Sequence, residues 1–254
     1  MLGSIAGDIV GSYYEMTSGA EEGFNLFRME SQDTSKGCRF TDDSVCTMAV
    51  MNALNTDMDF EKHLRDFAAR YPNRGYGGGF KAWLQTPVGT QNNSWANGAV
   101  MRVSPIGWFA NSVTEALDLA EQQASPSHNT ELAIKGAQAV ALTIFLARKG
   151  ETKQEIRNEL NNRFMFHIVD GTQLSVSAWR SAQICIEAAL QATSWEQAVR
   201  YLVCRGGDTD TFACISGGIC EVLYGLPNEI ADKARSFLPE DFLTIIEEFK
   251  RRIN

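Results

Sequence analysis

Apolar positions recur every three to four residues through most of the chain, and alternating runs of Val, Ile and Thr are almost absent. This spacing is typical of helices that bury one face. It predicts an all-α protein whose helices cover residues 2–15, 41–55, 60–69, 113–124, 131–146, 153–162, 175–192, 195–204 and 239–252. Many Ala and Gly residues on the inner helices indicate close helix packing, with a site at one end of the bundle.

Three of these helices begin with a sequence typical of a capping box. In each, Ser or Thr is followed three residues later by Glu or Gln, at residues 112–115, 152–155 and 194–197. In a capping box, the first side chain accepts a hydrogen bond from the third helical amide, and the last side chain reaches back to the first residue. The predicted starts of these three helices rest on this pattern.

Three stretches lack helical periodicity and are rich in Gly or polar residues: 17–40, 71–80 and 85–98. The first separates two acidic sites, as functional lids often do. The glycines at 75–79 allow a ligand to approach the backbone closely, although a flexible turn would use them equally well. Residues 94–98 place amides and a hydroxyl beside Trp95, which suits a nucleotide or a sugar.

Composition favours one globular domain over residues 1–254, with 44% hydrophobic and 21% charged residues. No apolar run approaches the roughly 18 residues of a membrane span, and the first residues lack the basic region of a secretion signal. A net charge of −8 argues against broad binding to nucleic acid. We expect a cytoplasmic monomer with no membrane partner.

Cysteine and histidine usage narrows the chemistry. The six cysteines form no Cys-x-x-Cys pair and mostly have apolar neighbours, which predicts free thiols. No Ser or Cys follows a nucleophile-elbow pattern, and the phosphate-loop and dinucleotide fingerprints are missing. Among the histidines, His63 is expected on a charged helix face and His167 in the core or on the surface. His128 precedes a long helix, where it could reach the mouth of the bundle.

Two acidic clusters carry the most specific signal, residues 41–44 (Thr-Asp-Asp-Ser) and residues 207–211 (Gly-Asp-Thr-Asp-Thr). Each precedes an apolar helix. If the fold joins them, four carboxylates meet, and such a group requires a cation or raised pKa values. Oxygen ligands favour Mg²⁺, Mn²⁺ or Ca²⁺. The alternative is a solvated face, which would carry interleaved Lys or Arg; neither cluster does. Asp8 and Glu15 are seven residues apart and would share one face of a helix. That face could be solvated, or it could lie beside the cations, where Glu15 would carry a proton.

These motifs, taken in order, resemble the ADP-ribosylglycohydrolase family, which includes the dinitrogenase reductase-activating glycohydrolase and the ADP-ribosyl-acceptor hydrolases. The resemblance covers nearly the whole chain. It rests on Gly7-Asp8-x-x-Gly11 with Glu15, Thr41-Asp42-Asp43-Ser44, Arg74-Gly75-Tyr76-Gly77, Asn97-Gly98-Ala99-x-Met101-Arg102, His128 and Gly207-Asp208-Thr209-Asp210-Thr211. Ser44 is a departure, because the family commonly has Thr there.

The resemblance implies an all-α fold with two divalent cations, Mg²⁺ or Mn²⁺, at the mouth of a cleft that takes ADP-ribose. The residues it implies as metal ligands are Thr41, Asp42, Asp43, Asp208, Asp210 and Thr211. It implies Glu15 and Asp43 as catalytic residues. The residues it implies as substrate-binding are Ser94 and Asn97 at the diphosphate, Trp95 beside it, Gly77 at the distal ribose, Gly98 and His128.

The expected function is therefore hydrolysis of the glycosidic bond between ADP-ribose and an acceptor, which reverses ADP-ribosylation. The acceptor could be a protein side chain, a nucleic-acid base or a small molecule. Two alternatives stay open. A two-metal site could serve a nucleotide phosphohydrolase, and a relative could keep the fold as a silent ADP-ribose-binding or structural protein.

Overall fold

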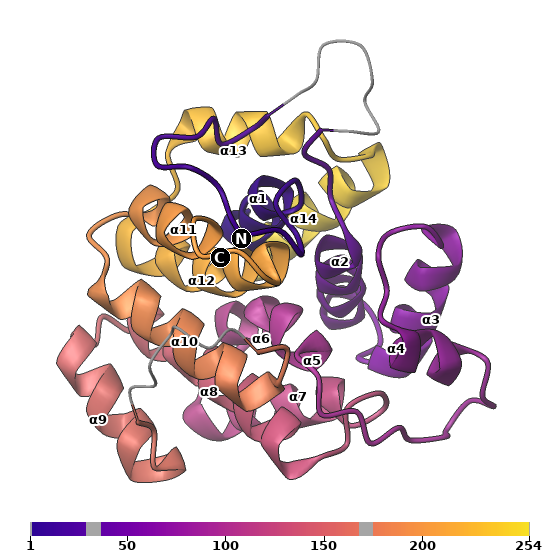
Figure 1. Ribbon diagram of the computed structural model, residues 1–254. Helices are drawn as coiled ribbons and strands as arrows, with labels where there is room; N and C mark the ends of the chain where they lie inside the picture. Colours follow the sequence, from indigo (N-terminus) through magenta and orange to yellow (C-terminus); the bar gives the residue numbers. More distant parts are fainter. Residues whose placement is uncertain (1, 29–36, 168–174, 254) are drawn as a thin grey trace.

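The computed structural model describes residues 2–28, 37–167 and 175–253, and these residues form one helical domain (Figure 1). Within them the extended segments make isolated bridges and no longer strand. The helices are α1 Gly3–Gly11, α2 Asp42–Asn55, α3 Phe60–Arg70, α4 Gly78–Leu84, α5 Gly98–Met101, α6 Ser104–Phe109, α7 Val113–Ala124, α8 Glu131–Arg148, α9 Lys153–Phe164, α10 Ala178–Gln191, α11 Trp195–Val203, α12 Thr209–Tyr224, α13 Asn228–Arg235 and α14 Glu240–Ile253. The predicted all-α fold is confirmed.

Most predicted helices are present, but the prediction is wrong at the end of α1, at α4 and at the start of α10, which is Ala178 and not residue 175. α1 ends at Gly11 and not at Glu15, because the chain turns there to pair with Gly207, to whose carbonyl the Met16 amide donates at 2.7 Å. Asp8 and Glu15 therefore do not share a helix face. α4 begins at Gly78, inside the stretch predicted to be irregular.

Three short helices, α5, α6 and α13, are not predicted by the sequence pattern. Part of the predicted loop 17–40, residues 29–36, lies outside the described residues. So do residues 168–174, which precede the helix predicted to begin at 175.

Only one of the three predicted capping boxes is complete. Thr152 accepts from the Glu155 amide, and the Glu155 carboxylate accepts from the Thr152 amide at 2.8 Å. At the other two starts, Ser112 and Ser194 cap as predicted. Their partners Glu115 and Gln197 reach the amide one residue earlier than the box requires.

The centre of the domain is the pair α1 and α12, which lie side by side in Figure 1. All nine residues of α1 are buried. Glycines allow the two backbones to touch: a Cβ atom on Gly7 would lie 2.0 Å from the Ala213 carbonyl oxygen, and one on Gly217 would lie 2.3 Å from the Gly3 carbonyl oxygen. The close packing expected from the small residues is therefore concentrated at this pair.

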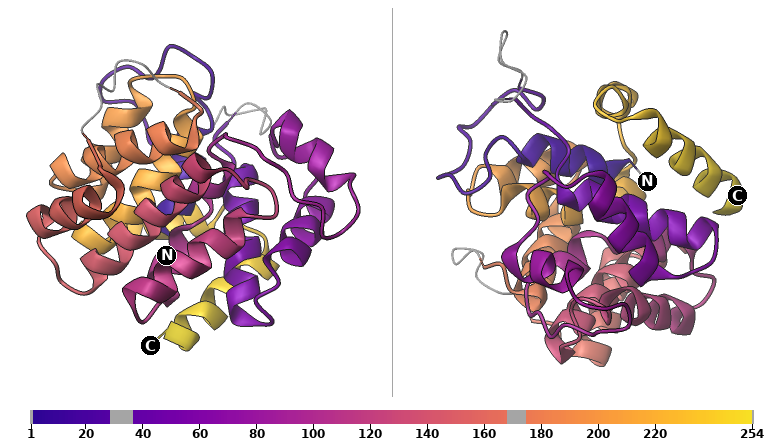
Figure 2. Two further views of the ribbon diagram at one scale, coloured as in Figure 1. Left: turned by 90° about the horizontal axis from the view of Figure 1, so that it is seen from below. Right: turned by 90° about the vertical axis from the view of Figure 1, so that its right-hand side faces the viewer.

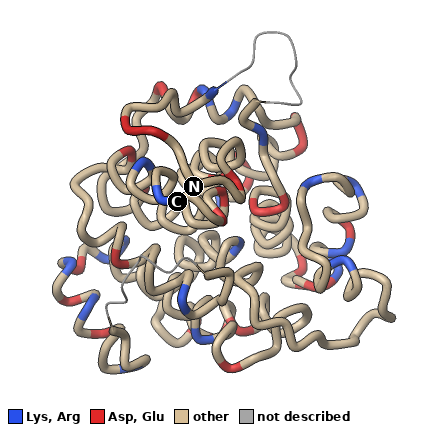
Figure 3. The backbone as a smooth tube through the Cα atoms, in the orientation of Figure 1, with Lys and Arg blue, Asp and Glu red and all other residues tan. Residues whose placement is uncertain are grey.

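The other helices surround this pair. α8 packs against α6, α7, α10 and α12, whereas α2 packs against α1, α3 and α14. Figure 2 shows α13 and α14, in yellow, along the outside of the molecule. Lys and Arg are spread over the outer helices, and acidic positions gather where the beginnings of α2 and α12 approach the end of α1 (Figure 3). No helix of the described residues combines the length and apolar character that crossing a membrane requires.

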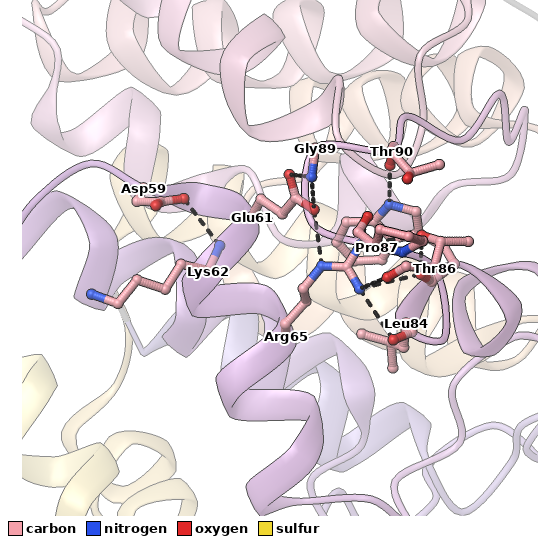
Figure 4. Close-up of polar contacts among 10 residues, drawn as sticks. Asp59, Glu61, Lys62, Arg65, Leu84, Thr86, Pro87, Gly89 and Thr90 are labelled. Carbon is pink, nitrogen blue, oxygen red and sulfur yellow. Dashed lines mark hydrogen bonds and ion pairs between the residues drawn. The ribbon is translucent and has the colours of Figure 1, made fainter.

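An arginine on α3 anchors the segment that leads into the predicted substrate-binding residues (Figure 4). Arg65 donates to the carbonyls of Leu84 and Thr86, both at 3.1 Å, and its guanidinium lies 4.2 Å from the centre of the Trp83 ring. Glu61 accepts from Arg65 (2.9 Å) and from the Gly89 amide (3.0 Å). Residues 84–89 are thereby fixed to α3 before the chain enters the site.

Two further predictions concern single residue types. All six cysteines are free thiols, as expected. His63 was expected on a charged helix face, which is wrong: its side chain is buried, with Nε2 2.8 Å from Asp57 Oδ1 and Nδ1 3.1 Å from Asn52 Nδ2.

Candidate functional site

The start of α2 is tied to α1 by one buried carboxylate. Asp8 accepts hydrogen bonds from the Thr41 amide (2.9 Å), the Thr41 hydroxyl (2.7 Å), the Ser44 amide (3.1 Å) and the Ser44 hydroxyl. Thr41 is also the N-cap of α2, where its Oγ1 accepts from the Asp43 amide. Asp8 therefore fixes the turn that presents Asp42 and Asp43.

The start of α12 is reached through a glycine turn. Gly206 and Gly207 have φ values of 78° and 77°, in the left-handed region that favours glycine. Gly207 exchanges hydrogen bonds with the segment after α1: the Met16 amide donates to the Gly207 carbonyl (2.7 Å), and the Gly207 amide donates to the Thr17 carbonyl (3.0 Å). This pairing places Glu15 beside Asp208.

The two acidic clusters do meet. Carboxylate oxygens of Asp8, Asp43 and Asp210 lie within 4.8 Å of one another, and so do those of Glu15, Asp208 and Asp210. Asp210 belongs to both groups. The fold thus brings together two segments that are far apart in the sequence.

The other residues expected as metal ligands lie around these groups in different ways. Asp42 lines the adjacent cavity but belongs to neither group. The Thr41 hydroxyl donates to Asp8 at 2.7 Å. The Thr211 hydroxyl donates to Asp43 Oδ2 at 3.3 Å.

Burial and mutual repulsion both raise the pKa values of the carboxyl groups. Loss of hydration, and then the charge of Asp210, raise the pKa of Asp43 well above its usual value. The pKa of Asp210 is also raised well above its usual value, by loss of hydration and then by the charge of Asp208. Desolvation followed by Asp8 raises the pKa of Asp42 to about 8. Glu15 also has a raised pKa, from burial first and Asp208 second.

One buried oxygen tests whether the cluster fits a cation. Asp43 Oδ1 is buried and has no hydrogen-bond partner among the described residues. A buried carboxylate oxygen without a donor is costly unless a cation occupies the position. Carboxylate and hydroxyl oxygens are hard ligands that suit divalent cations such as Mg²⁺. The residues present therefore fit the cations that the resemblance implies.

The clusters form one wall of a cavity of about 290 Å³. Most residues expected to bind substrate line it, together with the acidic residues and Arg102: Gly77, Ser94, Asn97, Gly98 and His128. Trp95 is not among the lining residues; its side chain is 60% exposed, although its neighbours Ser94 and Ala96 do line the cavity.

A larger hollow, of about 610 Å³, lies between the start of α3 and α7. Two of its four carboxylates, Asp59 and Glu61, already accept hydrogen bonds from backbone amides, as Figure 4 shows. The other two, Asp118 and Glu121, belong to neither of the carboxylate groups that could hold a cation within the described residues. The chemistry is therefore concentrated in the smaller cavity.

Asn97 contacts the acidic wall directly. Its amide Nδ2 donates to Asp208 Oδ2 at 2.7 Å and lies 3.4 Å from the Ser181 hydroxyl. This contact orients the Asp208 carboxylate, a role that the sequence does not predict for Asn97. Its expected contact with a diphosphate stays a prediction.

The sequence also does not predict the contacts of Asp8, or the hydrogen bond from Arg102 to Ser127 next to His128. Asp8 lies within a short run of small apolar residues, and a charged group in a buried helix requires partners; that pattern was the available signal. Arg102 likewise follows the buried residues Val100 and Met101. Ser127 carries no pattern that distinguishes it from a loop serine.

The chain is similar in sequence to proteins of one known family. The sequence profile of the ADP-ribosylglycohydrolase family matches residues 1–253. Human ADP-ribosylhydrolase ARH3 is 24% identical, over 89% of this chain and 84% of the human protein. The ADP-ribosylarginine hydrolase Tri1 of Pseudomonas putida (strain GB-1) is 25% identical, over 60% of this chain and 47% of that protein.

A solved structure, an ADP-ribosylglycohydrolase-related protein complex, superposes with a TM-score of 0.77 at 18% identity, covering 100% of this chain and 96% of that one. At that identity the likeness concerns the fold. The profile match over nearly the whole length shows that the chain belongs to the ADP-ribosylglycohydrolase family.

Proposed function

We propose that this protein is a metal-dependent hydrolase that cleaves the glycosidic bond between ADP-ribose and an acceptor. The observation that carries the proposal is the pair of carboxylate groups that share Asp210 and border the cavity. The family membership and the names of the ADP-ribosyl hydrolase relatives support it.

The acidic clusters would hold two divalent cations, Mg²⁺ or Mn²⁺. Asp43, Asp208 and Asp210 are the central ligands in this proposal, completed by Thr41, Asp42 and Thr211. Cations bound there would supply positive charge that can orient the hydroxyls of the distal ribose and lower the pKa of a water. Asp8 keeps the α2 turn in place through its four hydrogen bonds, and Asn97 keeps the Asp208 carboxylate aligned.

Glu15 is the proton carrier in this scheme. In the metal-free protein, burial and then the charge of Asp208 raise its pKa. What favours Glu15 for this role is its place: it lines the cavity, and its carboxylate lies within 4.8 Å of those of Asp208 and Asp210. The bond from the anomeric carbon to the acceptor breaks, and its electron pair leaves with the acceptor, which takes the proton of Glu15. Water adds to the anomeric carbon and returns a proton to Glu15.

The remaining cavity residues would bind the substrate. Ser94 and Asn97 would contact the diphosphate, with Trp95 beside it. Gly77 would adjoin the distal ribose, and Gly98 and His128 would border the ligand. The acceptor could be arginine, serine, a nucleic-acid base or a small guanidine, and we propose that the protein acts as a cytoplasmic monomer.

The test is incubation with ADP-ribosyl-arginine and ADP-ribosyl-serine peptides and with ADP-ribosylated DNA, under titration with Mg²⁺ and Mn²⁺. We expect free ADP-ribose as the product, and no turnover by Asp208→Ala or Asp210→Ala. Asp118→Ala, an exposed carboxylate on α7, is the matched control. Full activity of the two site variants in chelator would contradict the proposal. Release of AMP would indicate a phosphohydrolase, and binding without turnover a silent relative.

A further inference from the structure

A buried arginine at the cavity wall is connected to His128 through a serine. Arg102 and Ser127 are 0% exposed, and His128 is 4% exposed. Arg102 Nη2 donates to the Ser127 hydroxyl at 2.8 Å, and Ser127 Oγ lies 2.8 Å from His128 Nδ1. Gln123 holds the guanidinium from the other side, with its side-chain oxygen 2.7 Å from Nε and its carbonyl 2.8 Å from Nη2.

The hydrogen positions in this chain follow from what each group can donate. A guanidinium has no acceptor, so the Ser127 hydroxyl must accept from Arg102. Its own proton then has His128 Nδ1 as a partner. If Nδ1 carried a hydrogen, two donors would point at Ser127, and the buried hydroxyl proton would have no acceptor, which is costly. The satisfied arrangement leaves Nδ1 as an acceptor.

The protonation state of the ring points the same way. Burial, and then the positive charge of Arg102, lower the pKa of His128 well below its usual value. A neutral imidazole whose Nδ1 accepts must carry its hydrogen on Nε2.

The opposite edge of the ring lies against Gly98, another residue that lines the cavity. A Cβ atom on Gly98 would lie 2.8 Å from both Cε1 and Nε2 of His128. Among the described residues Nε2 has no hydrogen-bond partner, in contrast to Nδ1. The absence of a side chain at position 98 leaves this nitrogen open to a ligand.

The charge behind the ring indicates what kind of ligand atom Nε2 meets. Arg102 is the one Lys or Arg among the residues that line the cavity, and within the described residues it has no carboxylate at ion-pair distance. Its hydrogen-bond partners Gln123 and Ser127 are neutral. Five carboxylates also line the cavity, but Arg102 is the charged group that acts on the pKa of His128. At the ring, its positive charge therefore favours an anionic oxygen.

We propose that Arg102 and Ser127 are positioning residues that hold His128 neutral, with its Nε2–H directed into the cavity as a hydrogen-bond donor to an anionic oxygen of the ligand. His128 is then neither a general base nor a metal ligand, because its lone pair on Nδ1 is engaged by Ser127. Only the identity of the ligand, ADP-ribose, rests on the proposed function.

The hydrogen positions can be measured without any ligand. Nitrogen NMR of the imidazole rings distinguishes a nitrogen that carries a hydrogen from one that accepts, and with three histidines in the chain the His128→Gln variant assigns the signals. We expect His128 to be neutral at pH 6, with Nε2 protonated and Nδ1 accepting. Ser127→Ala should shift the Nδ1 signal. A hydrogen on Nδ1 in the wild-type protein would overturn the proposal, as would an unchanged Nδ1 signal in Ser127→Ala.

Ligand binding supplies a second, independent measurement. Ser127→Ala should weaken ADP-ribose binding roughly tenfold and raise KM with little change in kcat, because one hydrogen bond that orients the ring is lost. Ser125→Ala is the matched control, since the Ser125 hydroxyl donates to the Glu121 carbonyl outside this chain of contacts. Equal affinities of the two variants would contradict the positioning role.

A pair of substitutions at the histidine tests the donor itself. The amide nitrogen of Gln reaches the position of Nε2, whereas that of Asn reaches only the position of Nδ1. His128→Gln should therefore keep more ADP-ribose affinity than His128→Asn, with circular dichroism confirming that both fold. The reverse order would contradict an Nε2 donor. A protein that hydrolyses no ADP-ribosylated substrate but shows the expected nitrogen signals would refute the proposed function and leave this inference intact.

Discussion

The packing of α1 against α12 makes Gly7→Ala a sharp test of the fold that carries the site. The new Cβ atom would lie 2.0 Å from the Ala213 carbonyl oxygen, 2.4 Å from the Ala213 carbonyl carbon and 2.9 Å from the Cys214 amide nitrogen. Ordinary contacts of a Cβ atom begin near 3.4 Å. All three neighbours are backbone, so no side chain can rotate away and the two helices must separate by more than 1 Å.

The cost should lie at the upper end of the range measured for overpacked cores, about 3 kcal/mol or more. For a protein of this size, a loss of about 3 kcal/mol corresponds to a fall in Tm of roughly 6–12 °C. Because Asp8 follows Gly7 and holds the start of α2, the same displacement should weaken cation binding.

Urea unfolding of metal-free protein, followed by circular dichroism, measures this difference. Gly79→Ala is the matched control, because a Cβ atom there meets nothing within 4 Å and the residue lies in α4. Alanine in a helix is favoured over glycine, so the control should be unchanged or more stable by up to about 1 kcal/mol. A Gly7→Ala protein within about 0.5 kcal/mol of wild type would refute the close-packing argument.

Three further predictions follow from the site and its support. Burial raises the pKa of Asp42 to about 8, so the metal-free protein should lose stability as pH rises from about 4 to 8. Mg²⁺ should therefore raise Tm more at pH 8 than at pH 5, and an equal rise at both pH values would contradict this linkage. Glu15→Gln should lower kcat by roughly 10²-fold or more with the Mg²⁺-induced rise in Tm retained, and turnover near the wild-type rate would exclude Glu15 as the proton carrier. Arg65→Met should cost about 1–3 kcal/mol in thermal unfolding, because the carbonyls of Leu84 and Thr86 lose a charged donor; a cost equal to that of the exposed Arg163→Met would refute this anchoring role.

Helices with strong local signals are predictable from the sequence because their ends are set by nearby residues. Thr41 caps α2 and Thr152 caps α9 through contacts within four residues. The end of α1 is not predictable in this way, because Gly11 is followed by a turn that pairs with Gly207, almost two hundred residues later. α4 is not predicted because it begins with glycines, which disfavour a helix, and its helical form depends on burying Phe80 and Trp83.

In the candidate site, too, some features are predictable from the sequence and others depend on tertiary packing. The residue types and their order identify the two acidic clusters, and the fold brings them together. What each side chain contacts is set by tertiary packing: Asp8 holds Thr41 and Ser44, and Asn97 holds Asp208. No local sequence pattern predicts such contacts, because they join residues that are far apart in the sequence.

The most direct test of the central claim is the product released from an ADP-ribosylated peptide, measured with wild-type protein and with Asp210→Asn, which changes the residue common to both carboxylate groups. We predict release of free ADP-ribose that requires Mg²⁺ or Mn²⁺ and is lost in Asp210→Asn. Release of AMP, or release of ADP-ribose at the same rate in chelator or by the variant, would contradict a metal-dependent glycohydrolase.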